Sequence, residues 1–322
     1  MKVLLTGGAG YIGSHTTRLL IEKGFTPIII DSLENGHKEA IPSDVKFYNG
    51  NINNKELVNQ IFKENNISSI IHFAGYIEAG ESMSDPLKFF DNNVSNATTF
   101  LKIALKHNVK KFLFSSTAAV YGIPDKMPIT EEFPLVPVNH YGWTKLFFER
   151  ILDSCSVHGL KTICLRYFNA AGASYNIGED HAPESHLIPL ILRTALKQRD
   201  NIKIFGTDYP TKDGTCIRDY IHVLDLASAH IEALNLLEKD VTGKFNVGTG
   251  KGNSVKEVID ISRKITQLNI PAIETPRRPG DPAELIASSE KLQKESFWRP
   301  KYDIKDIIQS AWKWHSNNLQ GF

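Results

Sequence analysis

Cysteine is scarce in this chain of 322 residues, which contains only Cys155, Cys164 and Cys216. No two of them lie at a spacing typical of metal ligands, and an odd, sparse set is typical of proteins in a reducing compartment. The count therefore argues against a disulfide scaffold. Because the first residues already have the pattern of a core strand, we expect no cleavable signal and a cytoplasmic protein.

Excess charge and long apolar runs are lacking as well. The chain has 37 Lys and Arg against 36 Asp and Glu, a formal net charge of +1, so no general attraction to nucleic acid or to a membrane is expected. No uninterrupted apolar run is long enough to span a bilayer. The length and the hydrophobic content of 41% instead fit a globular protein with a large core.

The first half of the chain alternates strand and helix patterns. Such alternation predicts an α/β fold, with right-handed crossovers and a doubly wound parallel (Rossmann) sheet. Apolar runs such as 28–30 fit a sheet that is covered on both faces. The predicted strands are 2–6, 26–31, 45–48, 69–73, 111–115 and 162–167, and the predicted helices are 12–22, 55–64, 86–106 and 141–158.

Beyond residue 168 the chain becomes richer in loops, with helices predicted at 187–197, 223–237, 254–266 and 304–315 and strands at 203–205 and 244–247. This pattern predicts a smaller C-terminal α/β lobe that binds a substrate at the carboxyl edge of the sheet. We assign residues 1–168, with about 214–248, to the Rossmann domain. The lobe comprises about 169–213 and 249–322.

A glycine-rich turn follows the first predicted strand, with Gly7, Gly10 and Gly13 before and within the start of the first predicted helix. Glycines in such a turn let the backbone approach a pyrophosphate, and the helix N-terminus offers free N–H groups to it. Asp31 ends the second strand, where a carboxylate can bind the adenosine ribose and repel a 2′-phosphate. The pattern therefore predicts NAD rather than NADP.

Tyr141 and Lys145 lie four residues apart, on one face of a predicted helix. A free tyrosine has a pKa near ~10, and a neighbouring cation favours its phenolate. Tyr141 could then remove a proton from a substrate hydroxyl while NAD accepts a hydride. Ser115 and Thr117 lie where a strand ends at the same edge of the sheet and can bind the same substrate oxygen.

Further motifs extend along almost the whole chain: 72–75, 80–82, 91–94, 115–122, 165–169, 213–215, 218–223, 246–250 and 277–281. With the glycine turn and the Tyr141/Lys145 pair, they resemble the extended short-chain dehydrogenase/reductase superfamily, and more closely its nucleotide-sugar 4-epimerase branch. The resemblance implies reversible inversion at C4 of UDP-glucose and UDP-galactose through a transient 4-keto sugar, with NAD bound tightly and regenerated in each turnover. It also implies a homodimer through a four-helix interface formed by 86–106 and 141–158.

The resemblance gives roles to individual positions. Tyr141 is the expected base, Lys145 binds the nicotinamide ribose and tunes the base, and Thr117 bridges to the sugar 4-hydroxyl. The cofactor set, including the glycine turn, is Gly7, Gly10, Tyr11, Ile12, Gly13, Asp31, Asn35, Gly36, Asn51, Ile52, Phe73, Ala74, Gly75, Asn92, Ser115, Tyr141, Lys145 and Phe168. The substrate set is Thr117, Tyr141, Asn169, His186, Leu187, Phe205, Arg218, Arg278, Asp281 and Leu285, and no metal is expected.

Four positions depart from the pattern of the family. Asn51 stands where an Asp that contacts adenine is usual, and Ile77 replaces a Lys that often contacts the cofactor. His186 and Leu285 stand where several members have Asn and a large aromatic residue, beside the sugar pocket. The smaller Leu285 leaves room for an acetamido group, so preference for UDP-N-acetylglucosamine or a UDP-pentose stays open as an alternative.

Two more distant functions are weaker alternatives. A nucleotide-sugar 4,6-dehydratase needs an acid and a base near C5 and C6, but Ala118 and Ala119 occupy the positions after Thr117 where its Asp-Glu pair is usual. A non-catalytic NAD-binding regulator needs no base, and the intact Tyr141/Lys145 pair argues against it. The sequence thus favours an isomerase with NAD as cofactor and a UDP-sugar as partner.

Overall fold

The main sheet of the computed structural model, which describes residues 1–278 and 280–322, is parallel and seven-stranded. Its strands are ordered β3-β2-β1-β4-β5-β6-β10, so the chain starts in the middle and winds outward in both directions. The predicted doubly wound α/β fold is confirmed. The strands are β1 (Lys2–Thr6), β2 (Thr26–Asp31), β3 (Lys46–Asn49), β4 (Ser69–His72), β5 (Lys111–Thr117), β6 (Lys161–Tyr167) and β10 (Gly243–Val247).

Helices cover both faces of this sheet because successive strand side chains point to opposite faces. Leu5 and Ile29 pack with α1 and α8 on one face, whereas Leu4 and Ile28 pack with α2, α5 and α6 on the other. These helices are α1 (Tyr11–Glu22), α2 (Lys55–Glu64), α5 (Ala97–Lys106), α6 (His140–Ser154) and α8 (Val223–Glu238). Shorter turns of helix are η1 (Lys38–Ala40), α3 (Ala79–Ser84), α4 (Pro86–Phe90), η2 (Asp91–Asn96), η3 (Ala118–Tyr121) and η4 (Cys155–His158).

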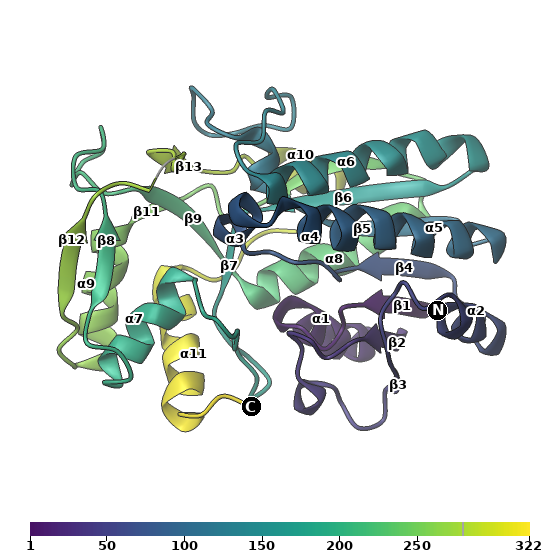
Figure 1. Ribbon diagram of the computed structural model, residues 1–322, viewed down its shortest axis with the longest axis horizontal. Coiled ribbons are helices and arrows are strands. Elements are labelled where there is room, and N and C mark those ends of the chain that lie inside the picture. Colours follow the sequence, from purple (N-terminus) through teal and green to yellow (C-terminus); the bar gives the residue numbers. More distant parts are fainter. Residues whose placement is uncertain (279) are drawn as a thin grey trace.

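A smaller lobe lies at one end of the molecule, beside the carboxyl ends of the main strands (Figure 1). It contains a four-stranded sheet of β7 (Asn169–Ala171), β9 (Ile217–His222), β11 (Gly252–Ser254) and β13 (Glu284–Leu285). A separate parallel pair joins β8 (Ile202–Phe205) to β12 (Ala272–Thr275). The helices α7 (Leu187–Ala195), α9 (Val255–Thr266) and α11 (Ile304–Asn317) share one apolar cluster there, and α10 (Glu290–Glu295) follows β13 in the chain.

The short helices α3 and α10 and the 3₁₀ turns η1 and η3 were not predicted, and the structure differs from the predicted elements in three further respects. The predicted helix 86–106 is interrupted, because six of its residues, Asp91–Asn96, form a π-helical stretch between α4 and α5. The predicted helix 141–158 ends as α6 at Ser154 and continues as the 3₁₀ turn η4. The strands β7, β9, β11, β12 and β13 were not predicted. Within the segment 214–248, β9 joins the small sheet, whereas α8 and β10 lie with the main sheet.

A buried ion pair fixes the position of α6 against the main sheet. Arg166 on β6 donates to both carboxylate oxygens of Glu149 on α6, at 2.9 and 2.6 Å. Ser116 near the end of β5 donates to the same carboxylate at 2.6 Å, and the hydroxyl of Tyr121 accepts from Arg166 at 3.0 Å. Because the charges are paired and hydrogen-bonded, they can be buried without a large penalty, and the residues one turn earlier on α6 are held in place.

In the part of the chain that the structure describes, no helix is long and apolar enough to cross a membrane. All three cysteines are free thiols, and Cys164 and Cys216 are buried.

Candidate active site

A cavity of about 410 Å³ opens at the carboxyl edge of the main sheet. It lies where the strand order reverses between β1 and β4, which is the usual ligand position in doubly wound sheets. Every residue assigned to the cofactor from the sequence lines this cavity, from Gly7 in the first turn to Phe168 after β6. Asn51 and Ile77, two of the positions that depart from the family pattern, line it as well.

The glycine turn is shaped in a way that only glycine permits. Gly7 has a φ of +72°, and a Cβ there would lie 2.6 Å from the backbone nitrogen of Ala74. A Cβ on Gly13 would lie 2.3 Å from the carbonyl oxygen of Gly7, so the start of α1 packs directly onto the turn. Tyr11, Ile12 and Gly13 at the start of α1 line the cavity, and the first turn of this helix has no acidic residue. This cradle fits a dinucleotide pyrophosphate.

Asp31 ends β2 beside the turn, as expected. One carboxylate oxygen accepts from the N–H of Ala9 and the other from the N–H of Leu33, both at 2.9 Å. Burial raises the pKa of this carboxyl, and the two backbone donors oppose that shift. A carboxylate has about four acceptor positions, so Asp31 retains acceptor capacity for ribose hydroxyls. These contacts fit NAD, and the charge of the carboxylate would repel a 2′-phosphate.

Tyr141 and Lys145 lie in the first turns of α6, and both line the cavity. The Lys145 ammonium group donates to the carbonyl oxygen of Ser115 at 2.9 Å and lies 5.9 Å from the centre of the Tyr141 ring. Burial lowers the pKa of Lys145 to about 8. The predicted pairing on one helix face is therefore present, and its cation is held by the end of β5.

The phenol of Tyr141 is buried within the site. Burial raises its pKa to about 12, and a hydrogen bond with Thr117 acts in the opposite direction. Thr117 ends β5, and its hydroxyl accepts from the N–H of Ala119 at 3.1 Å. The arrangement places a phenol, a hydroxyl and an ammonium group around one point of the cavity, which is the set needed for proton transfer at an alcohol.

The residues assigned to the substrate divide into two groups. Thr117, Tyr141, Asn169, His186 and Leu285 line the cavity, whereas Leu187, Phe205, Arg218, Arg278 and Asp281 lie outside its lining. Leu285 connects the groups, because it pairs with Arg218 in the small sheet.

Members of the second group contact one another. Arg218 forms an ion pair with Asp281, and the guanidinium carbon of Arg278 lies 3.8 Å from the centre of the Phe205 ring. Phe205 ends β8 opposite Thr275, the last residue of β12, and this register brings the loop after β12 next to the aromatic ring. Of the sequence motif 277–281, residue 279 lies outside the described residues.

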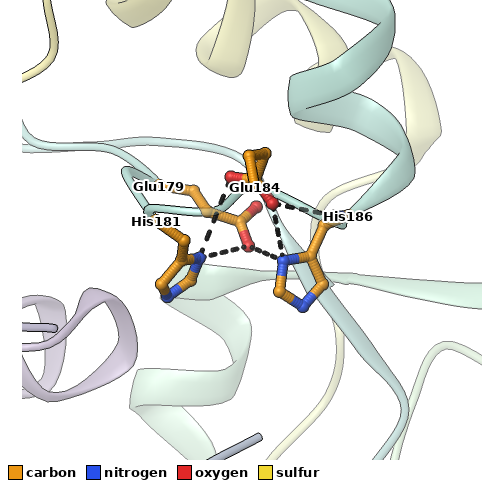
Figure 2. A group of neighbouring side chains, drawn as sticks. All are labelled: Glu179, His181, Glu184 and His186. Carbon is orange, nitrogen blue, oxygen red and sulfur yellow. Dashed lines mark hydrogen bonds and ion pairs between the residues drawn. The ribbon is translucent and has the colours of Figure 1, made fainter. Parts of the chain in front are cut away.

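Several cavity residues were not predicted from the sequence, and the most distinctive are Glu179 and His181. Together with Glu184 and His186 they form a close cluster in the loop between β7 and α7 (Figure 2). Loop residues have no periodicity to reveal them. The only signal in the sequence is their spacing, Glu-x-His-x-x-Glu-x-His, which concentrates four possible metal ligands within a short stretch.

Comparison with known proteins agrees with this geometry. Residues 3–248 match the model of the NAD dependent epimerase/dehydratase family. The chain is 52% identical to the UDP-glucose 4-epimerase of Halalkalibacterium halodurans over 100% of its own length and 98% of that protein. It is 47% identical to the UDP-glucose 4-epimerase of Lacticaseibacillus casei, covering 100% of this chain and 99% of that protein.

Among solved structures, the UDP-glucose 4-epimerase of Bifidobacterium longum in complex with NAD+ and UDP matches with a TM-score of 0.96. That protein is 40% identical, and the match covers 100% of both chains. The family model covers well over half of the chain, and the relatives match it from end to end. The chain belongs to the NAD dependent epimerase/dehydratase family.

Proposed function

We propose that this protein interconverts UDP-glucose and UDP-galactose by inversion at C4 of the sugar, with NAD as a bound and recycled cofactor. The observation that carries the proposal is the meeting of Tyr141, Lys145 and Thr117 in a cavity that the glycine turn also lines. A proton-transfer set beside a dinucleotide cradle is what reversible oxidation of a sugar hydroxyl requires. Identity of 52% and 47% to two UDP-glucose 4-epimerases over the full length of this chain supports the same substrate.

In this mechanism Tyr141 takes the proton of the 4-hydroxyl and later returns it to the oxygen of the inverted sugar. When bound, NAD would supply two things: a hydride acceptor for C4, which lets the sugar pass through a 4-keto form, and a positively charged ring near the phenol of Tyr141. Lys145 adds a second positive charge, which favours the phenolate over the phenol, and Thr117 orients the reacting oxygen. The pKa of Tyr141, raised to about 12 by burial, is therefore expected to fall when the positively charged ring of the cofactor is bound beside it.

The diphosphate end of the substrate is assigned to Arg218 and Arg278. Guanidinium groups bind phosphate oxygens through paired N–H donors, and the ring of Phe205 offers a stacking surface for uracil. If the diphosphate stays bound while the 4-keto sugar rotates, the sugar can present either face to the cofactor. The remaining assigned residues border other parts of the substrate. Next to the sugar we place Asn169, His186, Leu187 and Leu285. Next to the uridine ribose we place Asp281.

The experiment is turnover without added cofactor. Protein purified by gel filtration is incubated with UDP-glucose, and UDP-galactose is measured by NMR or by chromatography. We expect product at equilibrium with no added NAD and no net accumulation of NADH. Absence of turnover on UDP-glucose, UDP-galactose and UDP-N-acetylglucosamine alike would support a non-catalytic NAD-binding protein instead.

We also propose a homodimer that pairs the helices α4–α5 and α6. Three apolar side chains on neighbouring helices are exposed there: Met83 on α3 at 57%, Leu87 on α4 at 72% and Phe147 on α6 at 43%. Such a patch on adjacent helices is typical of a protein interface. Sedimentation should give twice the chain mass, and a monomer mass at working concentration would refute the proposal.

The sparse free thiols fit our further expectation of a cytoplasmic protein.

A further inference from the structure

The loop between β7 and α7 brings two histidines and two glutamates together beside the cofactor cavity. The four ligand atoms of Glu179, His181, Glu184 and His186 all lie within 4.8 Å of one another. Figure 2 shows the four side chains converging on one point from a single stretch of chain. Both imidazoles present Nδ1 toward the carboxylates.

The distances within the cluster are close to the edges of a metal tetrahedron. The Nδ1 of His186 lies 3.0 Å from Oε1 of Glu179 and 2.9 Å from Oε1 of Glu184. The Nδ1 of His181 lies 3.4 Å from the same oxygen of Glu179 and 3.8 Å from the other oxygen of Glu184, Oε2. With zinc–nitrogen and zinc–oxygen bonds of about 2.0–2.2 Å, neighbouring ligands of a tetrahedral ion are separated by roughly 3.3–3.5 Å. The observed separations lie on both sides of that value, so small side-chain movements complete the geometry.

A second observation points to a ligand at the same place. The Nδ1 of His181 and the Oε2 of Glu184 are buried and have no hydrogen-bond partner within the described part of the chain. The Nδ1 of His181 has ion-pair neighbours at 3.4 Å in Glu179 and at 3.8 Å in the Oε2 of Glu184, and the side chain of Glu184 is only 1% exposed. Buried polar atoms without partners are costly, and native structures leave few of them. A cation at the centre of the cluster would satisfy both atoms at once.

We infer that Glu179, His181, Glu184 and His186 form a binding site for a divalent metal ion, with zinc as the ion that fits best. Two imidazoles and two carboxylates match the ligand preferences of zinc, whereas calcium and magnesium prefer oxygen ligands alone. Two carboxylates balance the two charges of the ion, so the site becomes neutral when both imidazoles are uncharged.

Four protein ligands close the site, which makes the ion structural rather than catalytic. Its effect is to brace the loop 172–186, because Glu179, His181 and His186 line the cofactor cavity and α7 follows directly. The ring of Tyr11, the first residue of α1, lies 6.5 Å from that of His181. The ion thus fastens the lobe's loop next to the dinucleotide cradle, and its ligand His186 is also one of the residues assigned to the sugar.

The test measures metal directly. Full-length protein without an affinity tag is purified in buffers free of chelators, and zinc is determined by mass spectrometry. We expect about one zinc per chain, and less than about 0.1 in the double variant His181→Gln/Glu184→Gln, since loss of two of four ligands removes the coordination sphere. The matched control is His158→Gln/Glu290→Gln, which changes the same residue types at exposed positions of η4 and α10 and should retain the metal.

A second measurement keeps the inference testable if the double variant does not fold. Wild-type protein is stripped with a chelator and titrated with ZnSO₄ or CoCl₂ alone. Saturable binding of one ion per chain, with the visible absorption bands of tetrahedral cobalt and an increase in melting temperature, is the expected result. The loop retains other anchors, because Asp180 pairs with Arg193 at 3.3 Å and accepts from the N–H of Phe322 at 3.1 Å, so stripped protein should stay folded.

Wild-type protein that holds no zinc and binds neither ion would overturn the inference, as would equal zinc content in the double variant. The cluster would then be two protonated imidazoles paired with two carboxylates. Metal content and turnover are separate readouts. Zinc without epimerisation would remove the proposed function and leave the site, and epimerisation without zinc would do the reverse.

Discussion

The two halves of the candidate ligand site are built differently. The cofactor half is one open cavity, lined by residues at the ends of β1, β2, β4 and β5 and at the start of α1 and α6. The residues assigned to the uridine diphosphate lie in the smaller lobe and contact one another. Arg218 is paired with Asp281, and Arg278 lies over Phe205.

The cofactor half is already formed before a ligand binds, whereas residues of the uridine half have partners within the protein that a ligand would have to displace. In the cofactor half, backbone atoms and buried side chains already hold the shape of the cavity. In the uridine half, the proposed assignment requires a diphosphate to replace the carboxylate of Asp281 as the partner of Arg218 and a uracil to replace the guanidinium of Arg278 on Phe205. Part of the binding energy of the substrate is therefore used to break contacts within the protein. We expect the cofactor to stay bound while the UDP-sugar exchanges.

The largest expected effect comes from removing the base in the cofactor half. Tyr141→Phe keeps the ring and removes the hydroxyl, so turnover of UDP-galactose should fall by about 10²–10⁴-fold, the usual contribution of a positioned base. NAD content and KM should change little, because the cavity keeps its shape. Tyr48→Phe on β3 is the matched control and should retain wild-type turnover. A fully active Tyr141→Phe enzyme would remove Tyr141 from the mechanism.

The buried ammonium of Lys145 should make stability depend on pH. Burial lowers its pKa to about 8, below the ordinary value of 10.5, so between these pH values the unfolded chain binds more protons than the folded one. Stability of the nucleotide-free protein should therefore rise with pH across that window, by up to about 3 kcal/mol from this group. Urea unfolding at pH 8 and pH 10 measures the rise.

Lys145→Met should remove this contribution, whereas Lys102→Met, at an exposed position on α5, should not. The difference between each variant and the wild type cancels the titration of other groups. An equal rise in Lys145→Met and wild type would show that the lysine is not held in a desolvated, preformed site.

The exchange of partners in the uridine half is tested at Arg218. Arg218→Met removes the charge-assisted hydrogen bonds to the diphosphate, each contributing about 1.5–3 kcal/mol, so KM for UDP-glucose should rise roughly 10–100-fold. NAD content should not change. Arg263→Met, at an exposed ion pair on α9, is the control. Loss of NAD from Arg218→Met with unchanged KM would invert the assignment of the two halves.

The smallest expected effect is at Phe205. Phe205→Leu keeps an apolar side chain and removes the stacking surface, which contributes about 1–3 kcal/mol where bases stack on aromatic rings. The same substitution releases Arg278 from the ring, which offsets part of that loss. We therefore expect a several-fold weaker affinity for UDP in calorimetry. Stronger binding would mean that the contact between Arg278 and Phe205 blocks the site rather than forming it.

The two halves also differ in how well they can be predicted from sequence. Gly7, Asp31 and Tyr141 were assigned from the pattern of strand, turn and helix, and all three line the cavity. Parallel strands bring their carboxyl ends to one edge, so a residue just after a strand can be placed without knowing the packing. The fold of the first half was predictable for the same reason.

In the lobe, the helices α7, α9 and α11 and the strand β8 were predicted, but the small sheet could not be predicted in this way. Its strands β7, β11 and β13 have two or three residues each, which is too short for a periodic pattern. Arg218, Phe205 and Asp281 come from three separate segments, and their contacts depend on the register between β8 and β12 and between β9 and β13. Resemblance to the epimerase branch named these residues, but only the structure shows that Arg218 contacts Asp281 and that Phe205 contacts Arg278. The cluster of Glu179 and His181 was missed because its four members lie in a loop.

If NAD is held in the cavity and serves as the hydride acceptor for C4, the hydride taken from C4 should return to the same carbon when the sugar is inverted. The most direct measurement of this return uses UDP-galactose labelled with deuterium at C4, incubated with the purified protein in ordinary water without added NAD. The proposed mechanism predicts UDP-glucose that retains the deuterium at C4, as read by NMR and mass spectrometry. UDP-glucose with hydrogen from water at C4 would contradict it.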